Sequence, residues 1–416
     1  MVGNGPLSVF WFLYLASLGL LLPFFGLYLS DNAGLTGTEV GIVVTMSPLA
    51  ALVAPPAWGR LADRSRSRVR VLAFVTLGVA ATTTVFAWLE GFWQLAAGAF
   101  LVALFATGVI PLVISVTLAA LGEDALERFG RIRVWGTIGF FLLVVSFPTL
   151  LHALERVLGT SARSGGPAEP ALWMMFPAAA ALVLLSAFVA FTIPDAPAVA
   201  RPAQGGDWLE LGRNPGFVRL LAVSFATYLC FQGPMTLFPL YLRAHGGGLD
   251  TLSRMWVFML LLEIPLIAFS GVGLRHLGPR GVLAVGIAAG GVRWLVCGAV
   301  HDLWAVYAAQ LLHGVTVAGV GIGSALYVDA CVPRRLRSTG QGLNSTGLSV
   351  GSMLSNVGAG WLMDHVGVDA PFLVGGAGTL LLGLMVPLVL PPPRRFEDPT
   401  PEATERSLED GPSRSP

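Results

Sequence analysis

Three ionisable side chains lie within stretches of the sequence that are otherwise apolar. Glu263 stands in LLEIPLIAF, Arg293 in GGVRWLVCG and His313 in QLLHGVTVAG. A charged group inside a membrane costs several kcal/mol and usually faces a cavity or a partner. A carboxylate and an imidazole beside a fixed guanidinium can exchange a proton when a ligand shifts their balance. The simpler alternative is a structural ion pair between Glu263 and Arg293, with His313 satisfied in the core.

The elements that carry these residues are predicted to cross a membrane. Of the 416 residues, 55% are apolar and only 12% are charged, whereas a soluble domain has about a quarter charged residues. Twelve apolar stretches are about 20 residues long, enough to span a bilayer as helices. They cover 7–29, 39–57, 69–89, 92–118, 131–151, 171–193, 217–242, 254–274, 281–300, 303–328, 338–363 and 371–390. We therefore expect an all-α polytopic membrane protein.

The loops between the predicted spans differ in their arginine content. Arginines gather between spans 2 and 3, 4 and 5, 8 and 9, and 10 and 11, so the positive-inside rule places both termini in the cytoplasm. A charged segment rich in proline and glycine divides the spans six and six. We predict an N-terminal six-helix bundle over 1–193, a cytoplasmic linker over 194–216, a C-terminal six-helix bundle over 217–390 and a disordered cytoplasmic tail over 391–416.

The two halves share short motifs. FGLYLSDNAGLT at 25–36 matches FPLYLRAHGGGLDT at 238–251, and the loop GRLADRSRSRVR follows span 2 at 59–70. Here Gly59 would permit a tight helix end, Asp63 would meet a helix N-terminus or an arginine, and Arg64 would anchor the cytoplasmic face. The loop resembles the signature loop of the major facilitator superfamily, although the usual second glycine is missing. This resemblance implies the major facilitator fold of two six-helix pseudo-repeats. An ordinary basic turn is the alternative.

A second resemblance concerns the buried charges. Glutamate in span 8, arginine in span 9 and histidine in span 10 look like the proton-coupling and substrate-binding set of the lactose permease and phenylpropionate permease-like symporters. ERFGRIRVWGTIGFF at 127–141 is similar to the start of their fifth span, in which the second arginine, here Arg133, contacts substrate. The resemblance implies that Glu263, with His313, carries the proton and that Arg293 holds the glutamate. The alternative for Arg133 is that its side chain extends to the cytoplasmic surface.

The expected substrate pocket contains Ser115, Trp135, Phe140 and Trp294, although aromatic residues in membrane helices also pack or anchor at the interface. Related symporters usually place an acid at the position of Ser115, and the lactose permease has one at the position of Thr316. An arginine without a protein carboxylate prefers an anionic, bidentate partner. Arg133 therefore predicts a solute with a carboxylate, with an aromatic body suggested by Trp135 and Phe140. A neutral sugar or nucleoside is the alternative.

Taken together, these features predict a proton-coupled symporter that imports a small organic solute by alternating access. An exporter of drugs or metabolites is the alternative, although GTIGFFLLVVSFP at 136–148 lacks the glycine–proline motif of proton/drug antiporters. We do not expect an enzyme, because His301-Asp302 and Asp364-His365 have no third partner in the sequence. We expect no cofactor, no metal and no nucleic-acid partner. The partners would be the solute, protons and lipid around a monomer in a bacterial inner membrane.

Overall fold

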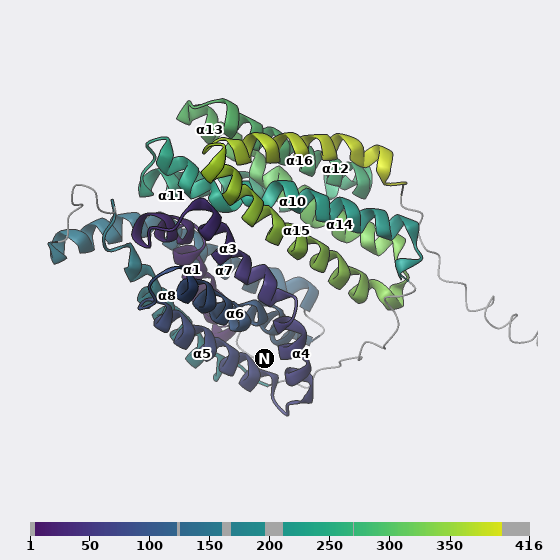
Figure 1. Cartoon of the computed structure of the whole chain (residues 1–416). Coiled ribbons are helices and arrows are strands. Elements are labelled where there is room, and N and C mark those ends of the chain that lie inside the picture. Colours follow the sequence, from purple (N-terminus) through teal and green to yellow (C-terminus); the bar gives the residue numbers. More distant parts are fainter. Residues whose placement is uncertain (1–4, 123–124, 160–167, 196–210, 269, 393–416) are drawn as a thin grey trace, which may run out of the picture.

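The computed structural model describes residues 5–122, 125–159, 168–195, 211–268 and 270–392 (Figure 1). The first half contains α1 (Gly5–Leu21), α2 (Phe25–Leu27), the π-helix η1 (Tyr28–Asn32), α3 (Gly37–Ala51), α4 (Ala54–Arg64), α5 (Arg68–Phe86), α6 (Phe92–Leu121), α7 (Ala125–Leu158) and α8 (Met175–Ala190). The second half contains α10 (Pro215–Ala244), α11 (Leu249–Ala268), α12 (Ser270–Ala299), α13 (Leu303–Gln310), α14 (Leu312–Cys331), α15 (Arg337–His365) and α16 (Ala370–Val389).

These helices form twelve spans, so the predicted all-α polytopic fold is confirmed. Several spans are built from consecutive helices, such as α1 with α2 and η1, α3 with α4, and α13 with α14. Ten spans in the described ranges are long and apolar enough to cross a membrane, and the more polar α15 is not among them. The polar side chains of α15 bond inside the protein, since Asn344 accepts from Ser224 at 2.7 Å and Asn356 accepts from Thr236 at 2.8 Å. These internal bonds allow a polar helix to lie at membrane depth.

The loop after α4 corrects one expectation. Gly59 does not form a helix end, because α4 continues through it to Arg64 and stops where Ser65 turns to extended backbone. Asp63 pairs with Arg68, the first residue of α5, as an arginine partner was expected. Arg68 also donates from Nη1 to Ser115 Oγ on α6 at 3.0 Å, while Arg64 is exposed. The loop therefore ties α4, α5 and α6 together at this end, which we call the arginine-rich end.

The hydrophobic cores show how the two groups of helices meet. One cluster, from Leu7 to Ile193, lies within α1–α8 and the residues beside them, and another, from Leu211 to Leu390, lies within the second half. We call these groups the first and the second bundle. A third cluster contains residues of both, including Phe24 and Phe238. Figure 1 shows the bundles close together where α3 begins and diverging toward α4 and the first turns of α15. The bundles thus share a core at the end opposite the arginine-rich one.

Polar contacts close this opposite end. Asp364, in the last turn of α15, accepts from the backbone N–H of Gly37 at 2.8 Å and of Thr38 at 2.7 Å, and so caps the N-terminus of α3 across the bundles. A Cβ added at Gly360 would strike the backbone of Gly37, so glycine is needed where the helices cross. Arg243, at the end of α10, pairs with Asp31 at 2.9 Å and with Glu169, both in the first bundle.

Candidate functional site

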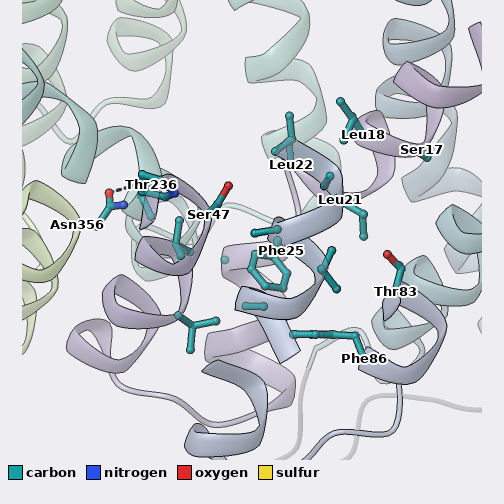
Figure 2. A pocket seen from close by; sticks show the side chains of 18 of the residues that line it. Ser17, Leu18, Leu21, Leu22, Phe25, Ser47, Thr83, Phe86, Thr236 and Asn356 are labelled. Atoms are coloured by element: carbon teal, nitrogen blue, oxygen red, sulfur yellow. Dashed lines mark hydrogen bonds between the residues drawn. The ribbon is translucent and has the colours of Figure 1, made fainter. Parts of the chain in front are cut away.

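A cavity of about 590 Å³ lies where the first bundle meets α10, α11 and α15. Figure 2 shows apolar side chains such as Leu21, Phe25 and Phe86 lining it, with Ser47 and the hydrogen-bonded pair Thr236–Asn356 on another side. The residues that line it are apolar or neutral polar, and none is charged. The cavity therefore suits a solute with a substantial apolar surface and a few hydrogen-bonding groups.

Arg293 is fully buried behind one wall of this cavity. Its Nε and Nη2 donate to Gln310 Oε1 at 2.9 and 2.7 Å, and its Nη1 lies 2.9 Å from His313 Nδ1. The guanidinium also lies 4.0 Å from the ring centroid of Trp294, a cation–π arrangement. Met235 and Phe238 line the cavity and also contact this guanidinium. Arg293 is thus separated from the cavity by one layer of side chains.

The structure does not contain the expected ion pair between Arg293 and Glu263. Among the described residues, no carboxylate lies within 4.0 Å of the Arg293 nitrogens, and Glu263 is instead 3.7 Å from the Nε2 of His313. His313 therefore stands between the two charges. Since a guanidinium has donors only, Nδ1 of His313 must accept from it and cannot carry a proton. The imidazole is then neutral, with its Nε2–H directed toward the carboxylate.

Close packing of α11 against α14 sets this contact. A Cβ added at Gly314 would strike the backbone of Glu263, so only glycine allows the two helices to approach here. His313 precedes Gly314 and is buried, whereas the side chain of Glu263 is 23% exposed and lies near the middle of the stretch from Leu249 to Gly278. Glu263 is therefore the solvent-accessible end of a series that runs from Arg293 through His313.

Arg133 comes from the other bundle, on α7. It is partly buried over the ring of Trp11, at 4.7 Å from the centroid, and its Nη1 is buried without a hydrogen-bond partner. Its charge interacts with that of Glu263 across the bundles. The side chain is therefore not simply extended to the surface. It presents a donor for which the described residues supply no acceptor.

The four residues expected to line the substrate pocket differ in where they lie relative to the cavity. Phe140 packs on Trp256, 5.8 Å between centroids, and Trp256 lines the cavity. Trp294 is fully buried beneath Arg293, so it supports the guanidinium and does not line the cavity. Trp135 is 47% exposed and does not line this cavity, so its assignment to a substrate pocket stays a prediction. Ser115 bonds Arg68 and likewise does not line the cavity.

Sequence reasoning missed Gln310, the main partner of Arg293. Its amide Nε2 also donates to the carbonyl of Val306 at 3.0 Å, which fixes its oxygen toward the arginine. One signal was present, because AAQLLHG places a glutamine three residues before His313 in an apolar span. Residues three apart share a helix face. The contacts of Arg243 and Asp364 across the bundles were missed as well, since they join residues far apart in the sequence.

Comparisons with known proteins agree with this architecture. A maltose permease from Geobacillus stearothermophilus is 28% identical over 391 residues, which are 92% of this chain and 93% of that protein. A probable 3-phenylpropionic acid transporter from Escherichia coli (strain K12) is 25% identical over 350 residues, covering 78% of this chain and 82% of that protein. The crystal structure of the nucleoside transporter NupG superposes with a TM-score of 0.80 at 17% identity, covering 94% of this chain and 99% of that one.

A family model covers nearly the whole chain. The MFS_1 like family matches residues 6–374, a range that contains Arg133, Glu263, Arg293 and His313. Its members are transporters and not enzymes, which confirms the expectation that this chain is not an enzyme. The protein is an integral membrane transporter of small molecules and belongs to the MFS_1 like family of the major facilitator superfamily.

Proposed function

We propose that this transporter is a proton-coupled symporter for a small organic solute, with Glu263 as the group that carries the proton. One observation carries the proposal. Glu263 is a partly exposed carboxylate within a membrane span, 3.7 Å from Nε2 of His313 in its own bundle, and its charge interacts with that of Arg133 in the other bundle. A carboxylate in that position changes its interactions with both bundles when it gains or loses a proton.

The coupling follows from these contacts. Ionised Glu263 is attracted to Arg133, which favours an approach of the bundles on this side, and protonation removes that attraction. His313 accepts from Arg293, so it supplies a fixed N–H toward the carboxylate and does not itself need to titrate. A solute that bonds Arg133 would compete with Glu263 for the guanidinium. Proton and solute binding are thereby linked through a single arginine.

The orientation is part of the proposal. By the positive-inside rule the arginine-rich end faces the cytoplasm, so the closed opposite end faces outward. The conformation described above is then inward-facing, with the outer side sealed by Asp364 on α3 and by Arg243 with Asp31 and Glu169. Uptake would require these contacts to open while Glu263 is protonated.

We further propose a monocarboxylate with an apolar or aromatic body as the solute. The unpartnered Nη1 of Arg133 supports an anionic group, and the apolar cavity that Trp256 and Phe25 line supports the body. The second candidate is a neutral sugar or nucleoside. It is favoured by the uncharged lining of the cavity, in which Thr236, Asn356 and Ser47 offer hydroxyl and amide groups.

Uptake into proteoliposomes tests the proposal. We expect wild-type protein to accumulate one of phenylpropionate, maltose or uridine when a pH gradient is imposed, and only to equilibrate it without the gradient. Glu263→Gln should lose accumulation but keep exchange of solute, because the amide keeps the shape and cannot carry the proton. Glu90→Gln is the control, since Glu90 is an exposed loop carboxylate and should leave accumulation unchanged. Gradient-driven accumulation by Glu263→Gln would overturn the assignment.

A further inference from the structure

Three potential metal ligands meet at the closed end of the second bundle, far from Glu263 in the fold. They are His245 at the end of α10, His301 in the turn before α13 and Asp369 at the start of α16. One donor atom from each lies within 4.8 Å of the others. The sequence suggested that His301 lacked a third partner. In the fold, His245 and Asp369 are its partners, because three separate segments between helices lie side by side here.

The distances between donor atoms fit a transition metal. Nε2 of His245 is 3.3 Å from Oδ1 of Asp369, and Nε2 of His301 is 3.3 Å from Oδ2 of the same carboxylate. Zinc bonds to nitrogen and oxygen are about 2.0–2.2 Å long, which places neighbouring ligands of a tetrahedral ion about 3.3–3.5 Å apart. Each imidazole nitrogen therefore lies at that spacing from one oxygen of Asp369, and the three donor groups lie within 4.8 Å of one another.

Asp369 is directed toward this position and not toward its own helix. It occupies the N-cap position of α16, yet its side chain makes no capping hydrogen bond. Its Oδ1 is buried and has no hydrogen-bond partner, although a carboxylate oxygen out of water normally has one. Asp369 therefore does not cap its helix, and its two oxygens face the two imidazoles, as the oxygens of a ligand would.

The first histidine is held in the tautomer that metal binding requires. Nδ1 of His245 lies 2.9 Å from the carbonyl oxygen of Tyr241, so this nitrogen carries a proton, and in the neutral ring Nε2 has the free lone pair. Ligating histidines commonly use their other nitrogen in this way. Tyr241 is itself fixed, because its hydroxyl donates to the carbonyl of Cys297 and its ring packs on Phe372. The ligand is thus supported by buried structure.

We propose that His245, His301 and Asp369 bind a divalent transition-metal ion, with Zn²⁺ as the best match to two imidazoles and one carboxylate. The side chain of His301 is 60% exposed, so the fourth position is open to water and the ion enters from the aqueous side. The bound ion joins the end of α10 to the starts of α13 and α16. All three ligands belong to the second bundle, so binding does not depend on how the two bundles are arranged or on the proposed proton coupling.

Cobalt and zinc titrations test this site. The full chain is purified through an affinity tag that contains no histidine, treated with a chelator and titrated with Co²⁺, which absorbs visible light when bound tetrahedrally. We expect one equivalent to bind, to be displaced by Zn²⁺ and to raise the melting temperature of the apo protein, because a ligand that binds only the folded state stabilises it.

His301→Ala and Asp369→Asn should each weaken binding by about tenfold or more and abolish the thermal shift. His301 is exposed, so its removal is compatible with folding, which gel filtration checks. His365→Ala is the matched control, because His365 is an exposed histidine at the same end that bonds Trp361 instead. The proposal fails if the wild type binds no Co²⁺, or if His301→Ala binds with the affinity and stoichiometry of the wild type.

Discussion

The imidazole of His313 links Arg293 to Glu263 without direct contact between the two charges. Its Nδ1 is 2.9 Å from the Nη1 of Arg293, and its Nε2 is 3.7 Å from the Oε2 of Glu263. The buried arginine needs an acceptor on one side, and the carboxylate faces a donor on the other. One neutral ring meets both requirements, so the two nitrogens have different roles.

The roles of the two nitrogens can be separated by substitution. In His313→Asn the amide oxygen can replace Nδ1 as acceptor for Arg293, whereas His313→Leu leaves that donor buried and unpaired. We expect His313→Leu to lose about 1–3 kcal/mol of stability and His313→Asn to lose much less. Both should change the pH profile of uptake, because neither directs an N–H toward Glu263. Thermal unfolding measures the first effect and transport across a pH series the second; equal melting temperatures would contradict the assigned tautomer.

Much of the fold was predictable because membranes impose strong constraints. Apolar runs of span length, the break near residue 200 and the arginine-rich loops all follow from the cost of placing polar groups in lipid. The same cost made Glu263, Arg293 and His313 recognisable as interior residues. What hydropathy does not report is the rotation of each helix about its own axis.

That rotation explains the errors in the site. Arg133 and Trp135 are two residues apart on α7, so their side chains point about 160° apart and cannot both lie on one face of the helix. The resemblance implied that Arg293 pairs with Glu263, yet it does not say which face of α12 meets α14. Gln310 and Gly314 decide this through a hydrogen bond and a close approach of helices. Both depend on contacts between spans that a single sequence does not reveal.

Gln310 should be essential for the stability of the second bundle. Its Oε1 receives two hydrogen bonds from a guanidinium that has no exposure to water. We expect Gln310→Leu to cost about 1.5–3 kcal/mol, as hydrogen bonds to charged groups do, and Gln310→Glu to retain stability by pairing the buried cation. The measurement is the apparent melting temperature in detergent. Gln94→Leu, at an exposed position, is the control and should change little; an equal loss in both leucine variants would argue against the assigned role.

Arg133 should distinguish the two candidate solute classes. If the solute is a carboxylate, Arg133→Gln removes a bidentate, charge-assisted hydrogen bond to it. The affinity should then fall more than tenfold, which corresponds to more than about 1.4 kcal/mol. Arg133→Lys should retain part of the affinity through its charge. For a neutral sugar or nucleoside, both variants should lose a similar amount of about 1 kcal/mol. Equilibrium binding of phenylpropionate and maltose measures the difference, and Arg131→Gln, exposed on the same helix, is the control.

The contacts of Glu169 predict how pH acts on the closed end. Burial raises the pKa of Glu169 above its ordinary value of 4.5; the charge of Arg243 opposes this shift without cancelling it, and the nearby Asp31 and Glu155 add to it. When the bundles separate, Glu169 is hydrated and its pKa returns toward 4.5. The closed state therefore binds this proton more tightly, so its stability rises as pH falls through the raised pKa and stops rising below 4.5.

Spin labels at the closed end can test whether acidification stabilises the closed state. We propose labels at Trp93→Cys in the first bundle and Trp304→Cys in the second, both strongly exposed, in a background without Cys230, Cys297 and Cys331. Pulsed electron paramagnetic resonance should show the short-distance population increasing on acidification. Glu169→Gln should raise that population at neutral pH and weaken its dependence on pH, and Arg243→Gln should reduce the population by leaving two acids uncompensated. Glu90→Gln should keep the wild-type response, and a short-distance population that instead grew at alkaline pH would show that the attraction of Arg243 outweighs burial.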